Sequence, residues 1–203
     1  MDRLDELFAA QLRLIHKIGP VYSANGFDDW TRAPVLDNRV HQAHVKYIAW
    51  CFIEELVEAE DAKSPEEARE EVVDALHFLL ELMIFCDVSP NTLFSRVMTS
   101  IGVAPAPTLD RLDYMFFMAG THPSYGKLNH VTLELGRAMY ELKQKPWRVT
   151  DKPANVEELR RSLGVLFHAF ISYAQSKGLT AKSLYFSYFE KNGINHARVE
   201  EKY

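Results

Sequence analysis

Two short acidic motifs are the candidate catalytic or metal-binding features of this chain. They read Glu-Glu-x-x-Glu over residues 54–58 and Glu-x-x-Asp over residues 71–74. In each motif two carboxylates stand three residues apart, so they project from one face of a helix. A tight turn between the motifs would make the two helices antiparallel neighbours, and their carboxylates would then converge on one point. The converging side chains are those of Glu55, Glu58, Glu71 and Asp74.

Converging carboxylates repel one another, and the apolar residues beside them argue against a fully solvated face. A like-charge pair costs about 0.2–0.5 kcal/mol on an exposed helix, and more when it loses water. Phe52 shares a helical stripe with Glu55, and Phe78 shares one with Asp74. Carboxylates in such surroundings either take up protons or hold a cation. Because all the ligands are oxygens, the expected cation is Mg²⁺, with Mn²⁺ as a substitute, and it would bind the phosphates of a nucleotide.

A single acidic pair is usually a solvated helix face, and the double motif on neighbouring helices is what favours metal binding. The alternative from another functional class is a non-catalytic helical interaction module that uses the acidic residues to bind a partner. A di-iron carboxylate site needs Glu-x-x-His on two helices, and the chain contains no Glu-x-x-His. His77 is therefore expected to be a core histidine or one that supports the metal ligands.

At these residues the sequence resembles the all-α nucleoside triphosphate pyrophosphatases, a superfamily that includes the MazG-like enzymes and the dimeric dUTPases. The continuation of the second motif, Glu-Val-Val-Asp-Ala-Leu-His-Phe over residues 71–78, is similar to that of the dimeric dUTPases. Gln11 is similar to the N-terminal glutamine of that family. Residues 188–198 are similar to its C-terminal lysine, asparagine and arginine motif. The resemblance implies an all-α fold, a nucleotide substrate and a homodimer.

The resemblance also implies the reaction, which is Mg²⁺-dependent hydrolysis of dUTP to dUMP and pyrophosphate. The chain departs from the family pattern at two places. Leu14-Ile15 stands where the family typically has a Leu-Asn pair, and residues 199–203 differ from the common Gln-x-x-Gly-Tyr ending. Because of these departures, the same chemistry on another nucleotide, such as dCTP or dTTP, is kept as an alternative.

By this resemblance, the four paired carboxylates would ligate two or more Mg²⁺ ions, and Glu54 would orient or deprotonate the attacking water. A further metal contact is the alternative role for Glu54. The water would attack the α-phosphorus, with Lys191 and Arg198 neutralising phosphate charge. Gln11 and Asn195 would supply amide hydrogen bonds to the base or the sugar.

Trp30 is the remaining candidate for nucleotide binding. It follows two aspartates in the loop after the first helical segment. Its indole ring would either stack on the base or anchor that loop, and the sequence does not distinguish these two roles.

The elements that position these residues are all expected to be helices, giving an all-α bundle of about seven to eight helices. No segment alternates with a period of two over a convincing length. Gly19-Pro20 should end the first helix and Gly193 the last, leaving a polar tail from residue 194. Capping boxes are expected at Ser64 and Asn155. The expected helices span about 4–18, 37–62, 64–86, 89–104, 108–119, 127–145, 155–178 and 180–193.

Length and composition bound the remaining possibilities. The 203 residues are expected to form one domain, with residues 88–150 as a candidate small helical subdomain or insertion. The net charge of −5 disfavours direct binding of nucleic acid. Two cysteines cannot form a disulfide scaffold, and no apolar stretch suits a signal peptide or a membrane span. We therefore expect a cytoplasmic protein, and the family resemblance implies a bacterial or phage-infected host.

Overall fold

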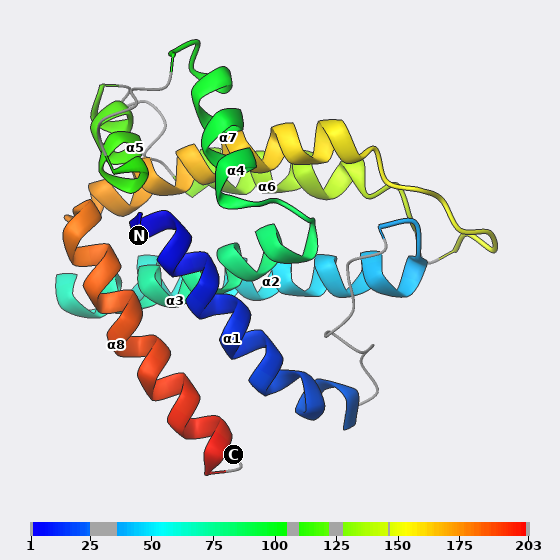
Figure 1. The fold of residues 1–203 in the computed structure, drawn as a ribbon, viewed down its shortest axis with the longest axis horizontal. Helices are drawn as coiled ribbons and strands as arrows, with labels where there is room; N and C mark the ends of the chain where they lie inside the picture. The colour runs from blue at the N-terminus through cyan, green and yellow to red at the C-terminus, as the bar shows by residue number, and fades with distance from the viewer. Residues whose placement is uncertain (1, 25–35, 105–109, 122–127, 146, 202–203) are drawn as a thin grey trace.

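The computed structural model describes residues 2–24, 36–104, 110–121, 128–145 and 147–201. Within these ranges the chain forms helices and no strands, which confirms the predicted all-α class (Figure 1). None of the described helices combines the length and apolar character needed to cross a membrane. The helices are α1 (Arg3–Ala24), α2 (Arg39–Asp61), α3 (Pro65–Phe85), α4 (Pro90–Ser100), α5 (Arg111–Gly120), α6 (Leu128–Glu141), α7 (Val156–Ser176) and α8 (Ala181–Glu200).

Side-chain caps explain where several of these helices begin. Ser64 accepts the backbone N–H of Glu67 at 3.1 Å, and the Glu67 carboxylate accepts the N–H of Lys63 at 2.7 Å. These bonds satisfy N–H groups that have no partner inside the helix. Thr180 and Ser183 form a reciprocal capping box at the start of α8. The capping box predicted at Asn155 is wrong, because its side chain makes no capping hydrogen bond.

Two helices continue past residues that were predicted to end them. Helix α1 contains Pro20, and α8 runs through Gly193 to Glu200. A proline removes one backbone hydrogen bond, and a glycine costs about 1 kcal/mol relative to alanine. Tertiary contacts offset such local costs. Lys17 of α1 donates to the carbonyl oxygen of His196 at 3.0 Å, so the end of α8 is held by α1. The polar tail predicted after residue 193 is therefore helical.

Helix α6 is shorter than predicted. It ends at Glu141 rather than near residue 145. Lys143 has a φ of 61°, a left-handed conformation that cannot continue a right-handed helix. The carbonyl oxygen of Glu141 accepts the N–H of Asn155 at 2.8 Å, which ties the end of α6 to the residue before α7.

All eight described helices share one buried cluster of apolar residues. Helices α2 and α3 form a hairpin, and α1 and α8 pack on each other and on α3 (Figure 1). Helices α4, α5 and α6 each pack on α7, so the helices between residues 88 and 150 share the core with the rest of the chain. This arrangement brings the N-terminal and C-terminal helices together over the hairpin that carries both acidic motifs.

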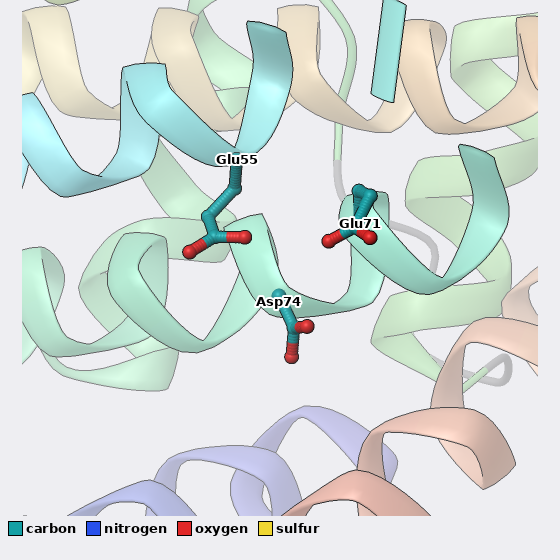
Figure 2. A group of neighbouring side chains, drawn as sticks. All are labelled: Glu55, Glu71 and Asp74. Atoms are coloured by element: carbon teal, nitrogen blue, oxygen red, sulfur yellow. The ribbon is translucent and has the colours of Figure 1, made fainter. Parts of the chain in front are cut away.

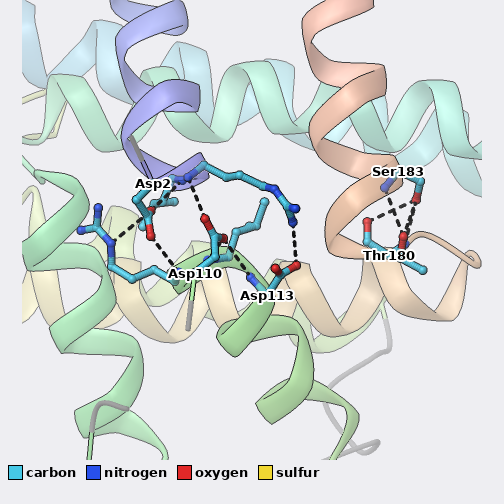
Figure 3. A network of polar contacts seen from close by, with 9 residues as sticks. Asp2, Asp110, Asp113, Thr180 and Ser183 are labelled. Carbon is cyan, nitrogen blue, oxygen red and sulfur yellow. Dashed lines mark hydrogen bonds and ion pairs between the residues drawn. The ribbon is translucent and has the colours of Figure 1, made fainter. Parts of the chain in front are cut away.

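The N-termini of α1 and α5 meet and exchange carboxylate caps (Figure 3). Asp110 caps α5 and also accepts the backbone N–H of Arg3 at 2.9 Å. Asp2 accepts the N–H groups of Leu4 and Arg111, each at 2.9 Å. Negative groups at helix N-termini are favourable because of the helix dipole. The exchange fixes the orientation of α1, which matters because α1 supplies one wall of the cavity described below.

Gly164 of α7 lies where α7 touches α4. A Cβ at position 164 would lie 2.6 Å from the Cβ of Arg96 and 3.1 Å from its carbonyl carbon. Because backbone cannot move aside like the end of a side chain, we expect Gly164→Ala to lower the free energy of unfolding by about 1–3 kcal/mol. Thermal unfolding followed by circular dichroism measures this. Gly136→Ala is the control, since a Cβ there meets nothing within 4 Å; equal stability of the two variants would contradict the prediction.

Candidate active site

The two acidic motifs come together on the α2–α3 hairpin, as their spacing predicted. Glu55 of α2 and Glu71 and Asp74 of α3 each offer a carboxylate oxygen, and these oxygens lie within 4.8 Å of one another (Figure 2). All three side chains are half-buried. Three carboxylates at this separation form a donor set made only of oxygens, which suits a hard divalent cation.

The surroundings of Glu55 and Glu71 favour the neutral form of these two carboxyls when no cation is bound. Burial, followed by the charges of Asp74, Glu58 and Glu71, raises the pKa of Glu55 to about 7. Burial and the charges of Asp74 and Glu58 also raise the pKa of Glu71. Glu58 is exposed and lies outside the trio, yet it is near enough to influence both partners. A divalent cation would relieve this repulsion.

Glu54 occupies the exposed side of α2. Its carboxylate accepts the indole N–H of Trp50, one turn earlier, at 2.8 Å. Consecutive helical residues point about 100° apart, so Glu54 and Glu55 face different directions. Its predicted role in activating water stays a prediction. Trp30 lies outside the described residues.

Helix α8 contributes a positively charged side chain, Lys191, to the cluster. The Nζ of Lys191 lies 2.5 Å from an Oδ of Asp74, and both side chains are largely shielded from solvent. The positive charge of Lys191 partly opposes the rise in the pKa of Glu55. This lysine belongs to the C-terminal motif predicted to bind phosphate, and it stands where a phosphate beside the acidic cluster would meet it.

A cavity of about 560 Å³ opens beside the cluster between α1, α3 and α8. Its volume is in the range of small-molecule sites. Apolar side chains from Leu14, Ile18, Val21, Phe78 and Val199 cover much of its wall. The predicted site residues that line it are Gln11, Glu55, Asp74, Lys191, Asn195 and Arg198. Six predicted residues from four helices therefore meet at one cavity, whereas Glu54, Glu58 and Glu71 are not among its lining residues.

The inner end of the cavity holds a hydrogen-bonded network of buried polar groups. The side-chain oxygen of Gln11 accepts the Tyr188 hydroxyl at 2.8 Å and lies 3.0 Å from Nδ1 of His77. The His77 ring stacks on Tyr188, with ring centroids 4.2 Å apart. Burial and the charge of Lys191 lower the pKa of His77 to about 3, so its ring is neutral near pH 7. Neutral His77 can donate from Nδ1, so Gln11 receives two hydrogen bonds on its oxygen.

Comparison with protein-family models gives a match. The model of a family described as dUTPase matches residues 58–203, well over half of the chain. The chain belongs to the dUTPase family. It is thus an enzyme of the dUTP diphosphatase type, which confirms the resemblance seen in the sequence and agrees with the helical fold. Comparison with curated proteins and with solved structures found no match.

The family match begins at Glu58, so it includes Glu71, Asp74 and the C-terminal helix but not α1. In this member of the dUTPase family, Gln11 and Glu55 lie outside the matched segment, yet the packing of α1 and α2 brings both to the cavity. The sequence interpretation missed Glu81 and Tyr188. One feature of the sequence indicates Glu81, since it is the single charged residue between Phe78 and Cys86 in an otherwise apolar run.

His77 was expected to be a core histidine or one that supports the metal ligands. The structure shows that it is buried, with 5% of its surface exposed, and that it also borders the cavity. Sequence position alone does not distinguish a core histidine from one that borders a cavity, because a residue on the core face of a helix can also line a cavity wall.

The raised pKa of Glu55 predicts a pH dependence of cation binding. A cation needs the ionised carboxylate, and with a pKa of about 7 Glu55 is mostly protonated below that pH. We therefore expect Mg²⁺ or Mn²⁺ affinity to rise about tenfold per pH unit up to pH 7 and then to level off. Titration calorimetry between pH 5.5 and 8.5 measures this. Glu55→Gln should flatten the dependence of cation affinity on pH. A wild-type affinity that stays constant from pH 5.5 upward would contradict the prediction.

Proposed function

We propose that this chain hydrolyses dUTP to dUMP and pyrophosphate with the help of Mg²⁺ at the cavity beside Glu55, Glu71 and Asp74. The observation that carries the proposal is the meeting of these carboxylates with Lys191 beside a cavity large enough for a small molecule. Membership of the dUTPase family supplies the reaction class. The base preference and the metal requirement are parts of the proposal.

The donor set fits Mg²⁺, with Mn²⁺ as a substitute. Glu55, Glu71 and Asp74 would hold the ion, and Glu58 would contribute from one turn along α2. Burial and the acidic neighbours raise the pKa of Glu55, and a bound cation would favour its ionised form. When bound, the metal would polarise a phosphoryl oxygen and lower the pKa of an attacking water.

The side chains of this chain would bind and orient the triphosphate. Lys191, about two and a half turns before the end of α8, and Arg198, in its last turn, both line the cavity and would neutralise phosphate charge. Glu54 would act as the base that orients or deprotonates water after turning from Trp50 toward the cluster. The apolar side chains of the wall would exclude water from a bound nucleotide, which strengthens its polar contacts.

Gln11 and Asn195 would hold the nucleoside. Both line the cavity on opposing helices, α1 and α8. Amide side chains offer both donors and acceptors, which suits hydrogen bonding to a base or a sugar hydroxyl. Gln11 is buried beside His77, whereas Lys191 lies against Asp74, so a nucleoside at Gln11 would direct its triphosphate toward the carboxylates.

A homodimer is part of the proposal, and an exposed stripe on α2 supports it. Val40, Tyr47, Trp50 and Val57 are between 43% and 61% exposed. Their spacing of seven, three and seven residues places them on one face of α2, which is typical of a helix that packs on a partner. Light scattering on wild type and on Trp50→Asp tests this; a monomeric wild type would contradict it.

The cytoplasmic location stays a prediction.

A panel of deoxynucleoside triphosphates with and without Mg²⁺ tests the proposed reaction. We expect dUTP to be the preferred substrate, pyrophosphate to be released, and EDTA to abolish turnover. In ¹⁸O-labelled water the label should appear in dUMP, because water attacks the α-phosphorus. Preferred hydrolysis of dCTP or dTTP would select the alternative substrate. No hydrolysis of any triphosphate would overturn the proposal and favour a non-catalytic role.

A further inference from the structure

Glu81 of α3 is a buried carboxyl at the inner end of the cavity. It is 5% exposed and lines the cavity wall. Among the described residues its side chain has one hydrogen-bond partner, the Gln11 amide, with an N–O distance of 3.5 Å, and no charged neighbour shifts its pKa. Burial raises its pKa to about 8. A buried carboxyl with one long hydrogen bond can accept further hydrogen bonds that the folded chain does not supply.

Packing alone does not account for this carboxyl. The neighbouring positions on α3, Leu80, Leu82 and Met83, are fully buried apolar residues. An uncompensated buried carboxyl costs stability, and a leucine would fit the same apolar run. Functional sites are where such costs are commonly found.

A second polar atom at the same end points to a ligand. The Nε2 atom of His77 is buried and has no hydrogen-bond partner among the described residues. His77 lines the same cavity as Glu81. Two polar groups with unmet hydrogen-bonding capacity at one end of a cavity indicate a ligand that carries polar atoms to that depth.

The position of Glu81 relative to Asp74 identifies which part of a nucleotide would reach it. The two residues are seven apart on α3, which is about 10.5 Å along a helix axis and brings them to the same face. Asp74 lies at the end that holds the carboxylate cluster and Lys191. A nucleotide with its phosphates at Asp74 would therefore extend its base toward Glu81.

The orientation of Gln11 defines the chemistry presented beside Glu81. Its side-chain oxygen is taken by Tyr188 and His77. Its amide nitrogen therefore faces Glu81 and the cavity. This end presents an acceptor on Glu81 next to a donor on Gln11. Uracil carries the complementary pair, an N3–H donor next to a carbonyl oxygen.

We propose that Glu81 is a base-recognition residue whose carboxyl accepts the N3–H of uracil while the Gln11 amide donates to the adjacent carbonyl oxygen. This inference rests on the proposed function and names the group that reads the base. Both the neutral and the ionised carboxyl have an oxygen that accepts this hydrogen. Tyr188 and His77 act as positioning residues, because they hold the Gln11 amide in the orientation that donates.

Binding of dUMP and of N3-methyl-dUMP to wild type and Glu81→Leu, measured by calorimetry, tests the proposal. Wild type is expected to bind dUMP about ten- to a hundredfold more tightly than the methylated ligand, since one buried hydrogen bond is lost. In Glu81→Leu this preference should shrink to a few-fold, while the melting temperature stays equal or rises. Glu81→Gln should keep the preference, because its amide oxygen also accepts N3–H.

The control is Glu134→Gln, which alters a buried carboxyl on α6 away from the cavity and should leave both affinities unchanged. Equal wild-type affinity for the two ligands would overturn the proposal without any variant. An undiminished preference in Glu81→Leu would overturn it as well. If wild type turns over dUTP but shows either result, this inference fails alone. If wild type neither binds dUMP nor hydrolyses dUTP, the proposed function fails and takes this inference with it.

Discussion

An Asp74→Asn variant is expected to lose at least about a thousandfold in kcat/KM for dUTP while keeping its helical circular dichroism spectrum. Asp74 belongs to the carboxylate trio, lines the cavity and pairs with Lys191 at 2.5 Å. Removing one group that stabilises charge in a transition state typically costs about 10²–10³ in rate, and Asp74 would serve both the cation and the lysine. Steady-state kinetics with saturating Mg²⁺ measures the loss.

Glu66→Gln is the matched control for Asp74→Asn. Glu66 lies in the first turn of the same helix, pairs with Arg69 and is largely exposed. Surface ion pairs of this kind contribute about 0–1 kcal/mol, so activity and stability should change little. An Asp74→Asn enzyme that retains more than a few per cent of wild-type activity would remove the cluster from the catalytic machinery.

A Lys191→Met variant is expected to lose about a hundred- to a thousandfold in kcat/KM. The methionine keeps much of the apolar stem of lysine but removes the charge that lies against Asp74 and faces the cavity. The same charge opposes the rise in the pKa of Glu55 that burial and the acidic neighbours cause. We therefore expect the pH midpoint of Mg²⁺ binding to move upward in this variant, a shift that a purely structural role would not cause.

Lys182→Met is the control for this charge removal. Lys182 is an exposed lysine near the start of the same helix and does not line the cavity. Its kinetics and metal-binding profile should match those of wild type. If Lys191→Met and Lys182→Met behave alike, Lys191 has no part in binding the triphosphate.

The two acidic motifs show how far local information reaches. Spacing of three residues on each helix and a short connection between the helices are properties of the chain within about twenty residues. They suffice to place Glu55, Glu71 and Asp74 together, because a helical hairpin has few ways to pack. The start of α3 is equally local, since Ser64 caps the helix it precedes.

The wrong helix ends show where local signals are overridden. Gly19-Pro20 and Gly193 are stop signals in a short window, but each costs only a few kcal/mol or less. Packing of α1 against α8, including the Lys17 contact with the carbonyl of His196, outweighs that cost. This matters for the site, because Asn195 and Arg198 lie in the part of α8 that was predicted to be a tail.

Local patterns predicted the helical class, the caps of α3 and α8, and the convergence of the acidic motifs, because each depends on residues close together in the chain. The tertiary structure was needed to show that Gln11 and Lys191, at opposite ends of the chain, line one cavity with Asp74. It also decided that Glu81 is buried there with one long hydrogen bond. Burial and hydrogen-bond satisfaction depend on which distant helices pack together, and a pattern within one helix does not contain that information.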